Sequence, residues 1–282
     1  MLVTLCSVDI KWEDKVSNLQ YLDTLFSQFT FHPDLVILPE MFNTGFTMNS
    51  SMAEDLESSQ TLKWLQSTAA KYNFAIVGSF PVVAEKKDLS GSKKIMVNRA
   101  FFVLPDSSFH YYDKRHLFRM GEENNHYSGG DEKCIVEYKG VRFALNVCYD
   151  LRFPVWSRNV DNEYDVLINV ANFPAPRVKV IEPLCRARAI ENMAYMLFVN
   201  RIGEDPQCKY LPSSFAVDYK GDIIGENITE KLNLNDFDRL LYPSSSDLQI
   251  INAEINIESL HLFRDKFPAW MDADKFEITN IR

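Results

Sequence analysis

Cysteine is scarce in this sequence, and its spacing suggests no pairs. The five cysteines, Cys6, Cys134, Cys148, Cys185 and Cys208, are scattered over 282 residues without a C-x-x-C pattern. Such usage is typical of reduced thiols in the cytoplasm. It argues against a disulfide framework or a zinc site.

Long hydrophobic runs are also missing, and the first residues do not have the pattern expected of a signal peptide. No apolar run reaches the roughly 18 residues that a membrane span requires. The segment 1–10 has no basic n-region and carries a charge at Asp9, so it does not resemble a signal peptide. We therefore expect a cytoplasmic protein without a membrane partner.

Glycine, histidine and positive charge are low as well. None of the 10 glycines forms a phosphate-binding loop after a predicted strand, so a nucleotide cofactor has no support. The five histidines show no metal-ligand spacing, and no metal site is predicted. A formal net charge of −9 argues against nucleic acid as the main partner.

What the chain does contain is an alternation of strand-like and helix-like segments. Apolar residues recur at helical spacing in 19–29, 62–72 and 181–193. Short apolar runs predict strands at 1–10, 35–39, 74–78, 95–104, 141–147, 165–171, 195–201 and 250–257, with a hairpin at 214–225 and a closing arm at 259–270. No repeat or low-complexity linker is present, and the alternation favours a layered α/β fold.

One cysteine stands at a position suited to catalysis. Cys148 follows the mostly apolar run 141–147, and Asp150, Arg152 and Pro154, residue types that open a helix, come directly after it. A sulfur near a helix N-terminus is expected to favour the thiolate form. The free backbone N–H groups there could also hold a developing oxyanion. Cys148 is therefore a candidate nucleophile.

Three charged residues are candidate partners of this thiol. Glu40 follows the predicted strand 35–39, Lys114 lies in a charged segment between aromatic residues, and Glu123 comes shortly after it. A thiol, a carboxylate base and a fixed cation are the groups that acyl transfer from an amide requires. Taken singly, Cys148 could be a core thiol, Glu40 a helix cap or part of a surface ion pair, and Lys114 part of a solvated charge cluster.

Three motifs together resemble the nitrilase, or carbon–nitrogen hydrolase, superfamily. They are Leu38-Pro-Glu40, Tyr112-Asp-Lys114-Arg-His-Leu-Phe118 and Cys148-Tyr-Asp-Leu-Arg-Phe-Pro154, in the family's order. Further segments are similar to the omega-amidase branch, among them Glu40-Met-Phe-Asn-Thr-Gly-Phe46 and Ala171-Asn-Phe-Pro-Ala-Pro-Arg177. The resemblance covers essentially the whole chain.

This resemblance implies a fold, an assembly and a reaction. The implied fold is a four-layer α-β-β-α sandwich of the nitrilase type, a single domain over residues 1–282 with 259–282 as a C-terminal arm. The implied assembly is a homodimer. The implied reaction is hydrolysis of the side-chain amide of a small alpha-keto acid, such as 2-oxoglutaramate or 2-oxosuccinamate, with release of ammonia and without a cofactor.

The resemblance also implies a role for each catalytic residue. Cys148 is expected to form the thioester, and Glu40 to act as general base for the thiol and then for water. Lys114 is expected to stabilise the oxyanion, together with the backbone N–H of Tyr149. Glu123 corresponds to a second, supporting glutamate of the family, although Glu122 is adjacent and remains an alternative.

The carboxylate of such a substrate requires a cation, preferably an arginine that can bind it through two hydrogen bonds. Arg177, Arg152 and Arg119 are candidates, and an ordinary ion pair is the alternative for each. We favour Arg177, because it follows the strand predicted beside that of the nucleophile. Phe46 and Phe173 are predicted to wall the cavity, with a place in the core as the alternative.

Three competing functions remain open from the sequence. One is another hydrolase of the superfamily, namely a carbamoylase, a nitrilase or an amidase for deaminated glutathione. A second is a non-catalytic binding protein with the same fold. A third is a thiol redox sensor, which would require Cys185 or Cys208 to approach Cys148 in space.

Overall fold

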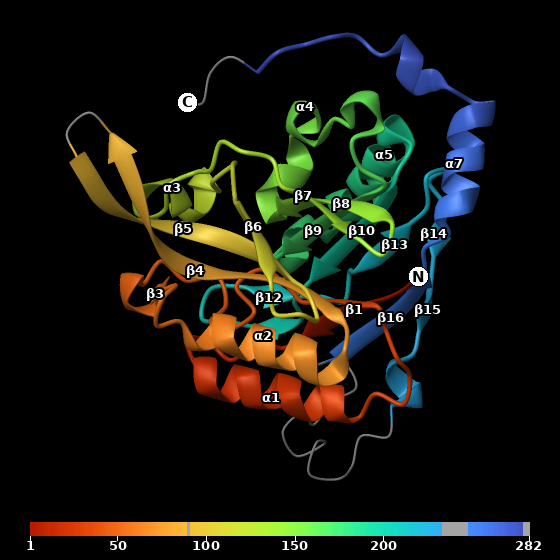
Figure 1. Ribbon diagram of the computed structural model, residues 1–282. Coiled ribbons are helices and arrows are strands. Elements are labelled where there is room, and N and C mark those ends of the chain that lie inside the picture. Colours follow the sequence, from red (N-terminus) through yellow and green to blue (C-terminus); the bar gives the residue numbers. More distant parts are fainter. Residues whose placement is uncertain (89–90, 233–247, 279–282) are drawn as a thin grey trace.

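The computed structural model describes residues 1–88, 91–232 and 248–278, and it contains two large β-sheets (Figure 1). The larger sheet has the strand order β15-β16-β1-β2-β4-β5-β6, with β3 paired to β4. Its strands are β1 (Leu2–Val8), β2 (Leu35–Ile37), β3 (Glu54–Asp55), β4 (Ala75–Asp88), β5 (Gly91–Val103), β6 (Phe109–Asp113), β15 (Glu226–Asn227) and β16 (Leu248–Glu254). No helix within the described ranges is long and apolar enough to cross a membrane.

The smaller sheet has the order β14-β13-β10-β9-β8-β7, and its central strands β8, β9 and β10 are parallel. Its strands are β7 (Ile135–Tyr138), β8 (Val141–Val147), β9 (Val166–Ala171), β10 (Tyr195–Asn200), β13 (Phe215–Val217) and β14 (Ile223–Ile224). A separate hairpin joins β11 (Gly203–Glu204) to β12 (Lys209–Tyr210).

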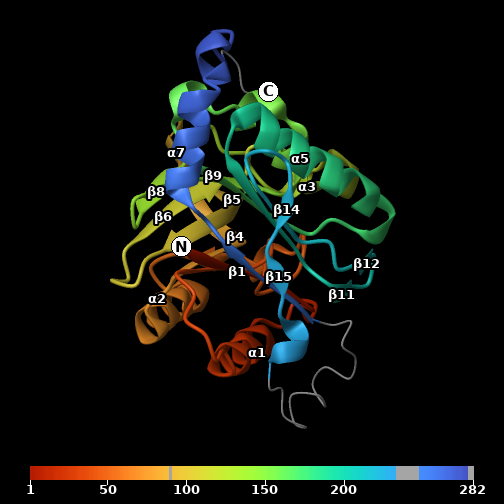
Figure 2. The ribbon, with the colours of Figure 1, turned by 90° about the vertical axis from the view of Figure 1, so that its right-hand side faces the viewer.

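Helices lie outside the two sheets. In Figures 1 and 2, α1 (Lys15–Ser27) and α2 (Gln60–Tyr72) lie beside the larger sheet, and α5 (Ile181–Asn192) lies beside the smaller one. The remaining helices are α3 (Glu123–His126), α4 (Pro154–Ser157) and α7 (Ile257–Lys266), with 3-10 helices η1 (Ser50–Met52), η2 (Arg119–Gly121), η3 (Cys148–Arg152), η4 (Val160–Asn162), η5 (Ala175–Val180), η6 (Thr229–Lys231) and η8 (Ala269–Asp272).

Side-chain alternation along the strands builds two hydrophobic cores. In β1, Val3 and Leu5 belong to the core shared with the smaller sheet, whereas Cys6 and Val8 belong to the core beneath α1 and α2. This period of two is the geometry of a strand, whose successive side chains point to opposite faces. Since both faces are covered, short strands such as β2 are apolar throughout. The predicted four-layer α-β-β-α sandwich is confirmed.

The boundaries of several predicted segments differ from the structure, and those of 74–78, 95–104 and 250–257 have a clear physical reason. The predicted strands 74–78 and 95–104 are parts of one long hairpin, β4–β5, whose outer half pairs charged residues such as Glu85 and Lys94 and so lacks an apolar signal. The predicted strand 250–257 ends earlier, because the Asn256 side chain accepts a hydrogen bond from the Ser259 N–H and caps α7. Residues 279–282 of the predicted arm lie outside the described ranges.

Candidate active site

Four strand ends bring the site together. Glu40 lies shortly after β2, Lys114 directly after β6, Cys148 directly after β8 and Asn172 directly after β9. The carboxyl ends of neighbouring parallel strands meet at one edge of a sheet, which is where α/β folds place polar side chains. The two sheets thus contribute to one site from opposite sides.

Glu40, Lys114 and Glu123 form a buried charged group, which we call the lysine cluster. All three residues have an exposed fraction of 0%. The Lys114 Nζ donates to Glu40 Oε1 at 2.8 Å and lies 3.0 and 2.9 Å from the two carboxylate oxygens of Glu123. Burial alone would lower the pKa of Lys114, but the charges of Glu123 and Glu40 outweigh it and hold the pKa well above its ordinary value.

Two asparagines hold the carboxylates of this cluster in place. The Asn98 amide donates to Glu40 Oε1 at 2.8 Å and to Glu123 Oε1 at 3.3 Å. The backbone N–H of Asn172 donates to Glu40 Oε2 at 2.9 Å, and its side-chain amide donates to the Glu40 backbone carbonyl at 2.8 Å. The orientation of Glu40 is therefore fixed by donors from both sheets.

Of the two neighbouring glutamates, Glu123 is the one that contacts Lys114. Glu123 opens α3, and its Oε2 accepts a hydrogen bond from the Phe118 N–H at 2.6 Å. Burial raises the pKa of this carboxyl, although Lys114 acts in the opposite direction. Glu122 is exposed, in a left-handed backbone conformation just before the helix. The structure thus places Glu123 against Lys114, as expected.

The turn that carries Cys148 is tighter than the sequence suggested. Cys148 adopts a φ of 48° at the start of the five-residue η3, a backbone conformation that costs energy for a residue with a Cβ. Burial, followed by the charge of Glu40, raises the pKa of its thiol well above the ordinary value. The expectation of a thiolate held by a helix N-terminus is therefore wrong, since only a short 3-10 turn follows and the thiol is buried beside a carboxylate.

The Cys148 thiol faces a cavity of about 250 Å³. Its walls contain five aromatic rings, two arginines and part of the β11–β12 hairpin. The lining residues are Phe46, Phe118, Met120, Gly121, Cys148, Tyr149, Arg152, Asn172, Phe173, Pro174, Arg177, Asp205, Gln207, Cys208 and Tyr210. The structure thus brings the predicted substrate residues Phe46, Tyr149, Arg152, Phe173 and Arg177 together.

Arg152 and Arg177, which we call the arginine rim, lack a carboxylate partner among the described residues. Arg177 instead contacts the Met120 sulfur and lies with its guanidinium 4.4 Å from the centre of the Phe118 ring. The third candidate, Arg119, is exposed and does not line the cavity. Two of the three arginines are thus placed to meet an anionic group.

Comparison with known proteins shows the family to which the chain belongs. The carbon–nitrogen hydrolase family matches residues 2–257. The chain belongs to this family. An omega-amidase, YafV of Escherichia coli K12, is 39% identical over 277 residues, which cover 98% of each chain. A 2-oxoglutaramate amidase of Bacillus subtilis is 26% identical over 269 residues, or 95% of each chain.

A solved structure of the family superposes on nearly the whole molecule. The protein XC1258 of Xanthomonas campestris, a CN-hydrolase superfamily protein with an arsenic adduct in its active site, has a TM-score of 0.83. The two chains are 33% identical, and the match covers 99% of each. The sandwich and the arrangement of its strand ends are therefore those of a carbon–nitrogen hydrolase.

The sequence did not indicate Asn98 and Asn172 as members of this hydrolase site. Asn98 interrupts the apolar segment 95–104, and an uncharged polar residue inside a buried strand is a signal that could have been used. Asn172 is one residue beyond the apolar run of β9, where its backbone amide is free of the sheet. Its contact with Glu40 spans 132 positions and could not be read from spacing.

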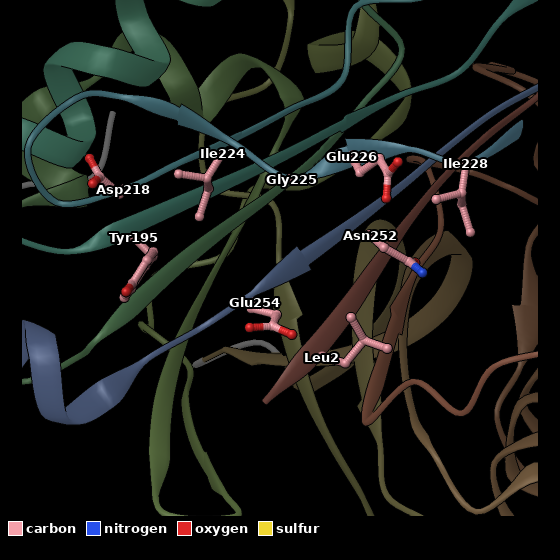
Figure 3. A pocket seen from close by; sticks show the side chains of 9 residues that line it. All are labelled: Leu2, Tyr195, Asp218, Ile224, Gly225, Glu226, Ile228, Asn252 and Glu254. Carbon is pink, nitrogen blue, oxygen red and sulfur yellow. The ribbon is translucent and has the colours of Figure 1, made fainter.

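Another cavity is lined by residues of a different chemical type from those at Cys148. It has a volume of about 500 Å³ and lies where β14, β15 and β16 meet (Figure 3). Asp218, Glu226 and Glu254 surround it, and no cysteine or cation lines it. It therefore lacks both the thiol and the cation that acyl transfer from an amide requires, and the cavity at Cys148 is the candidate active site.

Proposed function

We propose that the protein is an omega-amidase that hydrolyses the side-chain amide of short alpha-keto acids through a thioester on Cys148. The observation that carries this proposal is the lysine cluster beside the Cys148 thiol, at the base of a cavity with an unpaired arginine rim. The similarity to omega-amidase YafV over almost the whole chain supports the same activity.

In the proposed acylation step, Glu40 accepts the proton of the Cys148 thiol as the sulfur attacks the amide carbon. The raised pKa of Cys148 means that this proton is present at neutral pH, so a base must remove it during the attack. Lys114 and the Tyr149 backbone N–H stabilise the oxyanion. Glu40 then returns the proton to the departing nitrogen, and ammonia and the thioester result.

In the proposed deacylation step, Glu40 acts again as the base. It accepts a proton from a water molecule that attacks the thioester carbon, and the carboxylic acid and the free thiol are formed. Glu123 supports both steps by holding Lys114 from its second side. Because Glu40, Asn98 and Asn172 already share a fixed network, little reorganisation accompanies either step.

We assign the substrate carboxylate to Arg177, with Arg152 as the second cation of the rim. A guanidinium without a protein carboxylate can form two parallel hydrogen bonds to a substrate carboxylate. Phe46 and Phe173 close the sides of the cavity, and the Phe46 ring centre lies 5.3 Å from the Lys114 ammonium. A volume of about 250 Å³ favours a short substrate over a large one such as deaminated glutathione.

A panel of substrates tests this function. Ammonia release is measured with 2-oxoglutaramate, 2-oxosuccinamate, an aliphatic nitrile, a carbamoyl amino acid and deaminated glutathione. We expect the highest kcat/KM for one of the two keto-acid amides. A higher value for any of the other three would replace omega-amidase by the corresponding hydrolase of the same family.

We also propose that the protein works in the cytoplasm as a homodimer. Apolar side chains remain exposed on and near the helices beside the smaller sheet, including Val155 at 56% and Ile190 at 54%. A second copy that covers this side would extend the sandwich across the interface. Light scattering coupled to gel filtration is expected to give twice the monomer mass, and cell fractionation tests the compartment.

Finally, we propose that residues 1–282 form one domain with 259–282 as its arm. The arm is tied to the smaller sheet, because Arg264 in α7 donates to Asp165 Oδ1 at 2.7 Å and Leu260 is buried. A single calorimetric unfolding transition is expected. Two separate transitions would divide the chain into independent domains.

A further inference from the structure

A buried aspartate connects the two loops that carry Cys148 and Lys114. Asp150 has an exposed fraction of 0% and lies two residues after the cysteine. It has no role in the proposed chemistry, and the sequence suggested only that it opens a helix. Its hydrogen bonds show a different role.

Each carboxylate oxygen of Asp150 accepts hydrogen bonds from a different set of donors. Oδ2 accepts from the Val147 N–H at 3.0 Å, directly before Cys148, and from the Tyr112 hydroxyl at 2.8 Å. Oδ1 accepts from the backbone N–H of His116 at 2.9 Å and lies 2.7 Å from its ring Nδ1. One side chain therefore holds both the turn of the cysteine and the loop of the lysine.

The donors of Asp150 are themselves held by the same two loops. The Tyr112 hydroxyl accepts from the Trp156 indole at 2.9 Å and from the Arg115 N–H at 3.2 Å. Burial, and then the charge of Asp150, raises the pKa of Tyr112, so its hydroxyl remains a donor. The His116 ring stacks on Phe153, with ring centres 3.7 Å apart.

Neither Asp150 nor His116 is placed to contact a molecule bound in the cavity at Cys148. The residues that line the cavity at Cys148 include neither of them. A histidine bound to a buried aspartate would suggest a relay to the nucleophile, but here the ring stacks on Phe153 and its Nδ1 faces Asp150. Any effect of Asp150 on the reaction must therefore pass through the position of other groups.

We propose that Asp150 is a positioning residue, which sets the placement of the Cys148 sulfur relative to the Lys114 ammonium. The proposal rests on the function proposed above. The φ of 48° at Cys148 is unfavourable for a non-glycine residue, so surrounding contacts must hold the turn. The hydrogen bond from Val147 fixes the residue before this turn, and the two from His116 fix the residue two positions after Lys114.

The test is Asp150→Asn, measured by steady-state kinetics with the best amide of the panel. An asparagine offers one acceptor oxygen, so one of the two sets of donors is lost. We expect kcat to fall at least about 30-fold, because a displacement of about 1 Å can cost about 100-fold. KM is expected to stay within about threefold, because Arg177, to which we assign the substrate carboxylate, lies on η5 and has no contact with Asp150.

A matched control separates positioning from loss of stability. Asp165 is also a buried aspartate, with an exposed fraction of 1%, and it accepts hydrogen bonds from Arg142 and Arg264. It directly precedes β9, at the end of the strand opposite to Asn172. Asp165→Asn is expected to lower the melting temperature while kcat per folded molecule stays within about twofold. An equal fall of kcat in both variants would overturn the proposal.

A second variant keeps the test informative if Asp150→Asn does not fold. His116→Ala removes only the ring contact and leaves the backbone N–H of residue 116, so we expect an intermediate fall of kcat, at least about threefold, at unchanged KM.

The rate at which iodoacetamide alkylates Cys148, followed by mass spectrometry, is measured in parallel and does not depend on the substrate. An unchanged kcat together with an unchanged alkylation rate in His116→Ala would overturn the proposal, whether or not Asp150→Asn folds. A changed alkylation rate without turnover of any amide by the wild type would contradict the proposed function instead.

Discussion

The lysine cluster and the arginine rim hold their charges in opposite ways. In the cluster, Lys114 is fully buried between two carboxylates, and asparagine amides occupy further acceptor positions. At the rim, Arg177 and Arg152 lie at the cavity without a carboxylate partner among the described residues. The cation of the cluster is paired within the protein, whereas the cations of the rim have no carboxylate partner among the described residues.

This difference separates the chemistry from the recognition. Groups that stabilise charge during a reaction work best when they are already oriented, because reorganisation then adds nothing to the barrier. A cation that awaits a substrate anion must stay unpaired, since a protein carboxylate would compete for it. We therefore expect substitutions in the cluster to change kcat, and substitutions at the rim to change KM.

The largest effect is expected at the thiol that lies between the two groups. Cys148→Ala removes the only atom that can form the thioester, so ammonia release from 2-oxoglutaramate should fall to the background rate. The fold and the oligomeric state should remain, because the side chain loses a single sulfur atom from a site that is 8% exposed. Undiminished ammonia release would rule out the proposed mechanism.

The next largest effect is expected when the cluster loses its cation. Lys114→Met leaves Glu40 and Glu123 buried side by side, which should cost about 3–5 kcal/mol in the free energy of unfolding. Loss of the oxyanion partner should lower kcat by about 100- to 1,000-fold. Urea denaturation and steady-state kinetics measure the two effects separately.

An exposed ion pair is the control for this variant. Lys139 pairs with Asp34 at the surface, where its side chain is 49% exposed. Lys139→Met should change the free energy of unfolding by less than about 1 kcal/mol and leave kcat unchanged. Equal losses of unfolding free energy and of kcat in the two lysine variants would mean that burial between two carboxylates gives Lys114 no larger role than an exposed lysine.

Much of the fold and part of this site could be predicted from the sequence. Glu40 and Cys148 each follow a short apolar run, and the ends of buried strands are where such folds place functional side chains. The burial of Lys114 could not be predicted, because its neighbours Asp113 and Arg115 are typical of a solvated segment. It depends on contacts with Glu40, which is 74 positions away.

The features of the site that the sequence did not predict depend on backbone conformation and on contacts between residues that are far apart in the sequence. Residue types that open a helix do follow Cys148, but the turn is a short 3-10 helix, in which the Asp150 side chain accepts a hydrogen bond from the Val147 N–H. The raised pKa of the thiol follows from burial and from Glu40, and neither is visible in local sequence. Residue type thus made Cys148 a candidate nucleophile, but it did not indicate the direction in which the pKa of its thiol is shifted.

At the rim, Arg177→Ala should raise KM for keto-acid amides by about 10- to 100-fold at a nearly constant kcat. The bidentate charge-assisted contact that we propose for Arg177 would serve binding in the ground state and the transition state alike. A neutral amide such as butyramide should be affected less than about threefold. Equal changes of KM for both kinds of substrate would remove Arg177 from the carboxylate role, and Arg119→Ala should change neither, since Arg119 does not line the cavity.

The smallest effect is a change in the titration of Cys148, and it tests how the cluster acts on the thiol. Burial raises the pKa of Cys148 first, the charge of Glu40 raises it further, and Lys114 lowers it. Glu40→Gln removes the second contribution and leaves the third, so the pKa should fall and the pH midpoint of alkylation by iodoacetamide should move downward. Peptide mass spectrometry distinguishes Cys148 from Cys208, and the exposed Glu122→Gln should leave the midpoint in place. A midpoint that stays or rises in Glu40→Gln would mean that the charge of Glu40 does not raise the pKa of the Cys148 thiol.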